Sequence, residues 1–300
     1  MTSLSGSLPV VATGKIRSYV ALTKPRIIEL LLVTTLPTMF VARRGVPPVG
    51  LMLATLLGGA LAAGGANAIN MVVDRDIDKL MHRTRNRPLV TGAMTPRAAL
   101  VFALSLEAVA FVELWSRVNL LSAVLAVSAT AFYVFVYTLW LKRISAQNIV
   151  IGGAAGAVPV LVGWAAVTDR LGWAPVVLFA VIFIWTPPHF WALAIKYRDD
   201  YAAAGVPMMP VVATVKRTAS QIIVYTVLLI GISLLFAAVG HMGLLYLVSA
   251  LALGAGFLLY ALRLRRQPTV RAAMKLFSYS ITYLTLLFAA MAGDVLVRFH

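Results

Sequence analysis

The chain has 300 residues, of which 61% are hydrophobic and only 12% charged, whereas a soluble domain is nearer half apolar and a quarter charged. This composition excludes an ordinary soluble protein, and the absence of cysteine excludes disulfides, thiolate metal sites and cysteine catalysis. The net charge of +16 would suggest a nucleic-acid partner in a soluble protein, but here the basic residues lie in short loops between apolar runs, so we expect a membrane protein that binds no nucleic acid.

Nine apolar segments follow one another, most of them near the 20 residues that a membrane helix needs. They cover residues 27–42, 49–72, 98–115, 118–140, 147–168, 174–195, 219–240, 243–262 and 276–297. Before them, residues 1–22 are expected to be a flexible cytosolic lead-in, because their first 14 residues carry no charge. No linker or low-complexity stretch follows, so residues 23–300 are predicted to form a single all-α domain, a polytopic bundle of nine transmembrane helices.

The distribution of basic residues predicts the orientation of these spans. With the N-terminus in the cytosol, 21 of the 26 Lys and Arg residues lie on cytosolic segments. The alternation then requires nine spans and an external C-terminus. Two long loops, at residues 73–97 and 196–218, lie on the cytosolic side and hold five of the ten acidic residues. We therefore expect the active site to face the cytoplasm.

The first long loop begins with three polar residues at helical spacing. Asn70, Asp74 and Asp78 are each four residues apart, so on a helix they project from one face. Carboxylate and amide oxygens suit Mg²⁺, which prefers one or two carboxylates together with water and phosphate oxygens. The alternative is an ordinary solvated helix end in which the neighbouring Asp76 and Asp78 pair with basic residues.

Three arginines follow in alternation, Arg83, Arg85 and Arg87, before Pro88 stops any helix. Arginine clusters bind phosphate groups well, although cytosolic positive charge alone would also explain them. Next to a carboxylate face that binds a metal, they favour a diphosphate ligand, held by Mg²⁺ on one side and by guanidinium groups on the other.

The second long loop follows a span that contains Pro187 and Pro188, which we expect to break or bend the helix. His189 comes next among aromatic residues, and it is either hydrogen-bonded within the bundle or acts as a ligand or acid–base group. Asp199 or Asp200 could supply a second carboxylate to the metal.

Further candidates lie where other spans meet the cytosol. Lys24 and Arg26 precede the first span, and Tyr137 and Lys142 lie at the end of the fourth. Glu107 falls in the middle of the third span, where it could be paired inside the bundle; the sequence assigns it no role.

Several stretches resemble a known family. They are NAINMVVDRDIDKLMHRTRNRPLVTG, QNIVIGGAAGAVPVLVGWAAVT and WTPPHFWALAIKYRDDYAAAGVPMMPVV. The first is similar to the aspartate-rich motif of UbiA-type intramembrane prenyltransferases, and together they resemble the protohaem farnesyltransferase group within that family. The resemblance implies a nine-helix bundle around a central cavity, and farnesyl transfer from farnesyl diphosphate to a vinyl group of protohaem, with a hydroxyl supplied by water. The product would be haem O, which a haem A synthase could use downstream.

The resemblance also implies roles for individual residues. Mg²⁺ is the expected cofactor, on Asn70, Asp74, Asp78 and Asp200. The second family motif, Asp-x-x-x-Asp, becomes Lys196-x-x-x-Asp200 here, so Lys196 could take the place of one cation. His189 could ligate haem iron or orient a group near the vinyl. The residues expected to help bind the substrates are Arg83, Arg85, Arg87, Lys142, Arg198, Tyr137, Lys24 and Arg26.

Two other functions compete with this interpretation. A 4-hydroxybenzoate or other quinone-precursor prenyltransferase would share the fold, but TRNRP and PPHFW argue against it. A membrane transporter would fit a broken helix, but the carboxylates cluster at one face of the membrane and no inverted repeat is evident. The residues leave open one or two Mg²⁺ ions and a farnesyl or geranylgeranyl donor.

Overall fold

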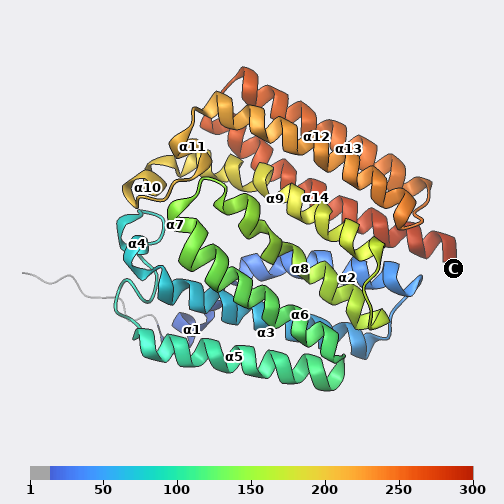
Figure 1. The fold of residues 1–300 in the computed structure, drawn as a ribbon, viewed down its shortest axis with the longest axis horizontal. Coiled ribbons are helices and arrows are strands. Elements are labelled where there is room, and N and C mark those ends of the chain that lie inside the picture. The colour runs from blue at the N-terminus through green and yellow to red at the C-terminus, as the bar shows by residue number, and fades with distance from the viewer. Residues whose placement is uncertain (1–13, 300) are drawn as a thin grey trace, which may run out of the picture.

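The computed structural model describes residues 14–299, apart from the side chain of Ile27, and in that part of the chain every regular element is a helix. The helices are α1 (Lys15–Thr23), α2 (Pro25–Arg43), α3 (Val49–Val73), α4 (Arg75–Leu80), α5 (Pro96–Arg117), α6 (Leu120–Ala131), the π-helix η1 (Phe132–Leu141), α7 (Lys142–Ile144), α8 (Asn148–Thr168), α9 (Trp173–Lys196), α10 (Arg198–Ala203), α11 (Met209–Val212), α12 (Val215–Val239), α13 (Leu244–Arg266) and α14 (Val270–Phe299). The long helices run side by side, and the short helices α4, α7, α10 and α11 gather at one end of the bundle, which we call the α4 end (Figure 1).

The described residues contain eight helices that are long and apolar enough to cross a membrane, and a ninth span if α1 and α2 are taken together as one bent pair. α6, η1 and α7 form one continuous span, Leu120–Ile144. Each of the nine predicted apolar segments coincides with one of these helices. The predicted fold class, an all-α multi-pass membrane bundle, is confirmed.

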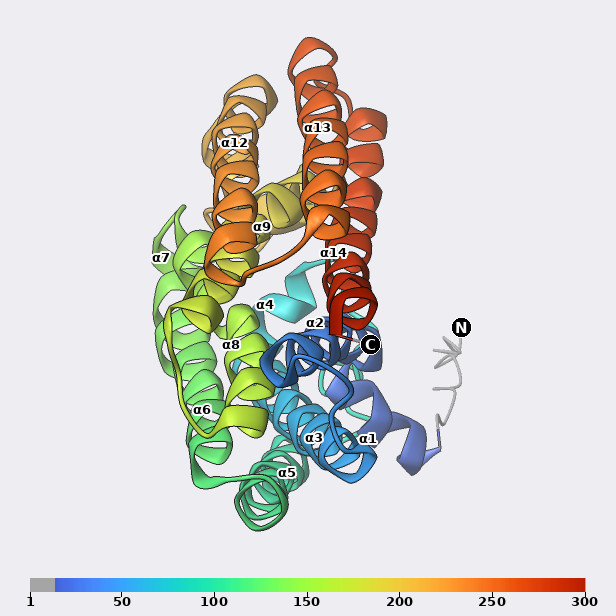
Figure 2. The same cartoon turned by 90° about the vertical axis from the view of Figure 1, so that its right-hand side faces the viewer.

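Two groups of helices share the bundle, as the end-on view shows (Figure 2). α3 packs on α5 and α8 on α6, while α12, α13 and α14 pack in sequence and α9 lies against α8, α12 and α14. Small residues let α3 and α5 approach closely: an added Cβ on Gly58 would meet Leu114 at 2.5 Å. The second group is held instead by large buried side chains such as Trp191, Phe257 and Phe288.

Of the predicted break or bend at Pro187 and Pro188, the break is absent, because α9 continues through both prolines to Lys196. Proline removes a backbone donor, so two carbonyls one turn earlier lose their helical partners. The Thr186 hydroxyl donates to the Ile182 carbonyl at 2.8 Å, immediately before these two carbonyls. Both prolines are buried, so packing against neighbouring helices maintains the helix where local preference opposes it.

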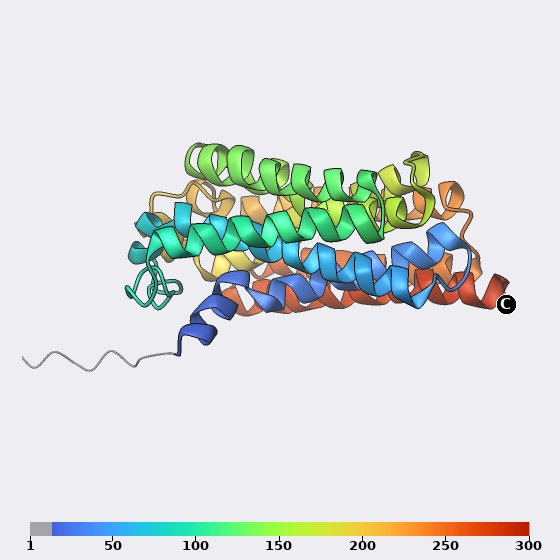
Figure 3. The ribbon, with the colours of Figure 1, turned by 90° about the horizontal axis from the view of Figure 1, so that it is seen from below.

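The predicted lead-in, residues 1–22, is only partly within the described residues. From Lys15 onward it is the helix α1, which packs on α3 and buries Leu22, so this part is not a flexible segment. Seen from below, α1 meets α2 at a sharp angle (Figure 3), which is 51° between the two helix axes. The turn occurs at Lys24, which has a positive φ of 52° and leads directly into Pro25.

Candidate functional site

A cavity of about 330 Å³ lies between α2, α3, α6, η1, α8 and α9. Most of its lining is apolar, with alanines and glycines of α3 and α8 opposite leucines of α2. The charged residues of the lining belong to segments at the α4 end: Lys24, Asp78, Arg83, Arg87 and Lys142. The site is therefore an apolar chamber with a charged end.

The sequence-predicted polar face forms at the junction of α3 and α4. Asp74 ends α3 and begins α4, and its backbone N–H bonds the Asn70 carbonyl at 2.9 Å. The Asp78 N–H bonds the Asp74 carbonyl at 2.9 Å in the same pattern, so the helical register continues through the junction. Asn70, Asp74 and Asp78 consequently lie on one face, and all three are at least 95% buried.

Each of the three polar side chains contacts a basic residue. Lys142 donates a hydrogen bond to Asp74 Oδ2, and Arg87 Nη1 lies 2.6 Å from Asp78 Oδ2. Lys24 Nζ donates to Asn70 Oδ1 at 2.9 Å. The buried Asp74 Oδ1 has no hydrogen-bond partner. A buried charged group without full compensation is costly, so this cluster is prepared for an additional charged ligand.

The π-helix η1 decides which side chains of its span face the cavity. In an α-helix, Tyr133 and Lys142 would point in opposite directions, because nine residues at about 100° each leave them half a turn apart. Both nevertheless line the same cavity, since π turns are wider. Thr138 anchors this face: it accepts a hydrogen bond from Asn70 Nδ2 at 3.2 Å and donates to the Tyr133 carbonyl at 2.8 Å.

The loop after α4 is tied to α10 across 118 positions of sequence. Both carboxylate oxygens of Asp200 accept backbone hydrogen bonds, from the N–H groups of His82 and Arg83, each at 3.1 Å. The Arg83 guanidinium lies 5.1 Å from the Tyr197 ring centroid and 3.4 Å from the Tyr201 hydroxyl. Burial raises the pKa of Tyr201, which keeps this hydroxyl neutral. The contacts hold Arg83 at the edge of the cavity.

A second ion pair joins α4 to α7. Arg143 donates to both oxygens of Asp76, at 2.7 and 2.8 Å, and these hydrogen bonds lower the pKa of Asp76 to about 2. Arg143 also contacts the Val73 carbonyl at the end of α3. The pair lies at the surface and places the neighbouring Lys142 beside Asp74.

The family model described as "UbiA prenyltransferase family" matches residues 31–290, which include Asn70, Asp74, Asp78 and every residue of the cavity lining except Lys24. The chain belongs to the UbiA prenyltransferase family.

Curated relatives of this UbiA-family chain are similar over nearly its full length. A protein of Parafrankia sp. (strain EAN1pec) is 55% identical over 290 residues, 95% of this chain and 92% of the relative. One of Streptomyces avermitilis is 52% identical over 292 residues, 95% of each chain. Both are named protoheme IX farnesyltransferase.

Solved structures share the fold at low identity. A digeranylgeranylglyceryl phosphate synthase superposes with a TM-score of 0.77 at 17% identity, covering 94% of this chain and 99% of the other. A UbiA homologue from Archaeoglobus fulgidus, bound to DMAPP and Mg²⁺, has a TM-score of 0.64 at 15% identity, covering 91% and 99%. These similarities establish the UbiA fold for this chain.

Some predicted site residues of this UbiA-family chain lie away from the cavity lining. The exposed ones are Arg26, Arg85, Lys196 and Arg198. Lys196 instead lies 5.3 Å from the Tyr197 ring centroid. For these four residues, a role in substrate binding stays a prediction.

His189 faces α14 from α9. Its ring lies between Trp185 and Phe277, at centroid distances of 4.2 and 4.6 Å. Its Nδ1 is 2.7 Å from the Ser280 hydroxyl, which donates its own proton to the Phe277 carbonyl at 2.6 Å. With the Ser280 hydroxyl donating to Phe277, the tautomer that protonates Nδ1 lets His189 donate to Ser280 and leaves Nε2 without a proton. The residues on either side of this turn, Thr186 and Phe190, line the cavity.

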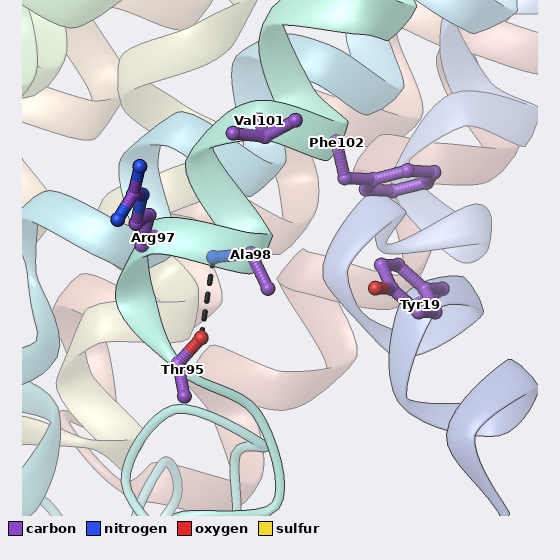
Figure 4. Close-up of a pocket in the computed structure, with 6 residues that line it drawn as sticks. All are labelled: Tyr19, Thr95, Arg97, Ala98, Val101 and Phe102. Carbon is purple, nitrogen blue, oxygen red and sulfur yellow. Dashed lines mark hydrogen bonds between the residues drawn. The ribbon is translucent and has the colours of Figure 1, made fainter.

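A shallow second pocket lies between α1 and the start of α5 (Figure 4). The rings of Tyr19 and Phe102 meet edge to face, with centroids 4.8 Å apart, and Thr95 caps α5 by accepting from the Ala98 N–H at 3.2 Å. Arg97 is its one charged lining residue, and the pocket includes none of the predicted site residues.

Sequence reasoning missed Tyr133, Thr138 and Tyr201. Tyr133 stacks on Tyr137 at 5.4 Å with an interplanar angle of 19°, and both rings line the cavity. A signal for Tyr201 was available, since it directly follows Asp200 in the charged loop. The sequence contained no signal for Tyr133 or Thr138, because the orientation of their side chains depends on the π-helix.

Proposed function

We propose that this chain converts protohaem to haem O by transferring a farnesyl group from farnesyl diphosphate to the 2-vinyl group of the porphyrin, with water supplying the hydroxyl. The observation that carries the proposal is the apolar cavity that ends in buried carboxylates and basic side chains. Such a site suits a substrate with a long apolar chain and an anionic head. The names of relatives more than 50% identical over 95% of the chain support the substrates.

The donor set at the polar face fits Mg²⁺. Asp74 Oδ1 is buried and accepts no hydrogen bond, and Asp78 and the amide oxygen of Asn70 lie on the same face. Among the described residues no three His, Cys, Asp or Glu side chains form a metal site, so an amide or the substrate must complete the set. Asn70, Asp74 and Asp78 would hold the ion, which supplies Lewis-acid neutralisation of the diphosphate. The A. fulgidus homologue, which shares the fold and is bound to DMAPP and Mg²⁺, supports Mg²⁺ as the cofactor.

The basic residues at the same end provide the remaining positive charge. Lys24, Arg83, Arg87 and Lys142 all line the cavity. Bidentate guanidinium groups and ammonium groups bind diphosphate oxygens, and they stabilise the negative charge that develops as the carbon–oxygen bond breaks. Asp200 holds the loop that carries Arg83, which supports a positioning role; its predicted role as a metal ligand stays a proposal.

The apolar lining protects the allylic cation that remains. Tyr133 and Tyr137 present stacked rings to the cavity next to Lys142, and aromatic faces stabilise positive charge. Exclusion of bulk water favours attack of the vinyl carbon over premature hydrolysis. In the tautomer that protonates Nδ1, His189 could ligate haem iron through Nε2 from the side of α9 next to Phe190.

The chain is a multi-pass membrane protein, and we place it in the cell's inner membrane with a cytosolic N-terminus. The excess of basic residues in the loops at the α4 end supports this orientation. The diphosphate end of the cavity then faces the cytoplasm, where farnesyl diphosphate and Mg²⁺ are available, while both apolar substrates enter from the bilayer.

The decisive experiment supplies both substrates to the purified protein. We expect incubation with haem B, farnesyl diphosphate and Mg²⁺ to yield haem O, identified by mass analysis of the extracted porphyrin, and expect none when Mg²⁺ is chelated. Parallel reactions with 4-hydroxybenzoate test the quinone-precursor alternative. Prenylation of 4-hydroxybenzoate with unmodified haem would replace the proposed function.

A further inference from the structure

Glu107 is a carboxylate in the middle of the membrane that the proposed chemistry leaves unused. It lies eleven residues from the start of α5, at Pro96, and ten from its end, at Arg117, so it is roughly 15 Å from either end of the helix. Ionisable residues at this depth are costly to keep and usually functional. Among the described residues, no basic side chain lies within 4.0 Å of the Glu107 carboxylate. The charged partner that the sequence allowed for is therefore absent from this part of the chain.

The carboxylate of Glu107 is joined to the cavity by one hydroxyl group. Its Oε1 accepts a hydrogen bond from Thr130 Oγ1 at 3.1 Å, and Thr130 lines the cavity. Its Oε2 is buried without any hydrogen-bond partner. Gly65 provides the space, because an added Cβ there would meet Glu107 Oε1 at 2.6 Å. The bundle therefore accommodates, next to the lining residue Thr130, a carboxylate that has no ion-pair partner among the described residues.

The reaction proposed above requires a proton acceptor in this chamber. The bond between farnesyl C1 and the diphosphate oxygen breaks, and C1 bonds to the terminal vinyl carbon. The positive charge then resides on the inner vinyl carbon, to which water adds through oxygen. The adduct must lose one proton to become the neutral alcohol. Four of the five charged lining residues at the α4 end are cations and bind the diphosphate, so a base elsewhere in the cavity would let the water proton leave without involving the diphosphate.

We propose that Glu107, acting through Thr130, takes up the proton of the water that adds to the vinyl-derived cation; this inference rests on the proposed function. Thr130 Oγ1 receives the proton from the water as it passes its own proton to Glu107 Oε1. The electron pair of the broken O–H bond stays on the alcohol oxygen. Once the alcohol has formed, the proton returns by the same path to water that enters the emptied cavity. Carboxylates are suited to this step, and relay through one hydroxyl retains hydrogen-bond geometry.

The relay decides which product forms. When no base receives the water proton, water addition reverses, and the cation instead loses a proton from the adjacent carbon to the released diphosphate. That elimination gives an alkene that is lighter than haem O by one water. Glu107→Gln retains the size and one oxygen acceptor but removes the basic group. We expect the ratio of haem O to this alkene to fall about 100-fold, a typical contribution of a general base, while diphosphate release continues.

Matched variants distinguish a chemical role of Glu107 and Thr130 from a purely structural one. Glu113→Gln makes the same substitution in α5 at a residue that pairs with Arg117 at 3.3 Å, and we expect a wild-type product ratio. Thr130→Val removes the relay hydroxyl without changing the size of the side chain, and Thr130→Ser restores it. The valine variant should yield the alkene and the serine variant haem O. This pair decides the question if Glu107→Gln does not fold.

Two outcomes would overturn the relay. In the first, Glu107→Gln lowers total prenylation but leaves the product ratio unchanged, which is the mark of a purely structural role. In the second, Thr130→Val makes haem O in the wild-type ratio. Failure of the underlying function looks different, because the wild-type protein itself would then produce no prenylated haem.

Discussion

Arg87 and Asp78 form an ion pair of 2.6 Å at the charged end of the cavity, with the carboxylate almost completely buried and the guanidinium one-fifth exposed. Asp78 is in α4, and Arg87 is nine positions later in a loop folded back over it by hydrogen bonds such as that from the Thr84 hydroxyl to the Asp78 carbonyl, at 2.9 Å. One segment thus supplies both a candidate metal ligand and a candidate diphosphate ligand. The pairing lets a buried carboxylate exist before substrate arrives.

The buried carboxylates should be essential for turnover. We expect Asp74→Asn and Asp78→Asn each to lower haem O formation by about 100-fold or more, because the substitution removes the negative charge that attracts Mg²⁺ while it keeps the size of the side chain and one oxygen acceptor. Initial rates over a range of Mg²⁺ concentrations measure the effect, and size-exclusion chromatography checks the fold. Asp169→Asn, at the exposed residue that ends α8, is the control and should behave as wild type. Normal rates and normal Mg²⁺ dependence in both site variants would remove the metal role.

Asp200 has a different predicted outcome, because its oxygens accept backbone hydrogen bonds from the loop at His82 and Arg83. Asp200→Ala should destabilise this region by about 1–3 kcal/mol. We expect faster proteolysis within residues 82–95 and a raised KM for farnesyl diphosphate, with an unchanged Mg²⁺ requirement. A strongly increased Mg²⁺ requirement with an intact loop would instead make Asp200 a metal ligand, as the sequence suggests.

His189 tests the position of the porphyrin. If its unprotonated Nε2 ligates haem iron, His189→Ala should weaken haem binding about tenfold, or about 1.4 kcal/mol, and shift the Soret band. Absorption spectra during a haem titration measure both quantities. His241→Ala, in the exposed turn between α12 and α13, should change neither. An unaltered spectrum and affinity in His189→Ala would leave the residue a purely structural role against Ser280.

Asp294 should contribute to stability without contributing to chemistry. It is buried in α14, and its oxygens accept from the Gly243 and Tyr246 N–H groups at 2.6 and 3.3 Å, so it caps the start of α13 from another helix. Asp294→Ala should cost about 1–2 kcal/mol and lower the Tm, whereas Asp294→Asn should lose less because an acceptor remains. Thermal unfolding in detergent measures this order. Equal Tm values for the alanine variant and wild type would show that the cap is not needed.

Much of the fold followed from local rules. Hydrophobic length predicts the nine spans because a bilayer sets the length of each helix. The spacing of Asn70, Asp74 and Asp78 predicts their shared face because helical register is local, and the structure continues it across the end of α3. The metal and haem roles of individual residues stay predictions, since they concern ligands rather than the chain.

Three features could not be predicted from local sequence. α9 passes through Pro187 and Pro188 because its neighbours bury them, although proline locally disfavours a helix. The contacts of Asp200 depend on where a loop 118 positions earlier comes to lie. The wider turns of η1 follow from packing around the cavity and not from any periodicity of its residues.

The sequence by itself determined that the chain crosses the membrane repeatedly and carries a polar helical face, because hydropathy and residue spacing act within a few turns of one helix. Only the tertiary structure decided which charges meet. Lys142 reaches Asp74 because a π-helix turns it inward. In the described part of the chain Glu107 has a hydrogen bond from Thr130 but no ion-pair partner, because α5 and α6 pack there without a counter-charge. Such pairings are set by how helices far apart in the sequence pack around a shared space, and no single segment contains that information.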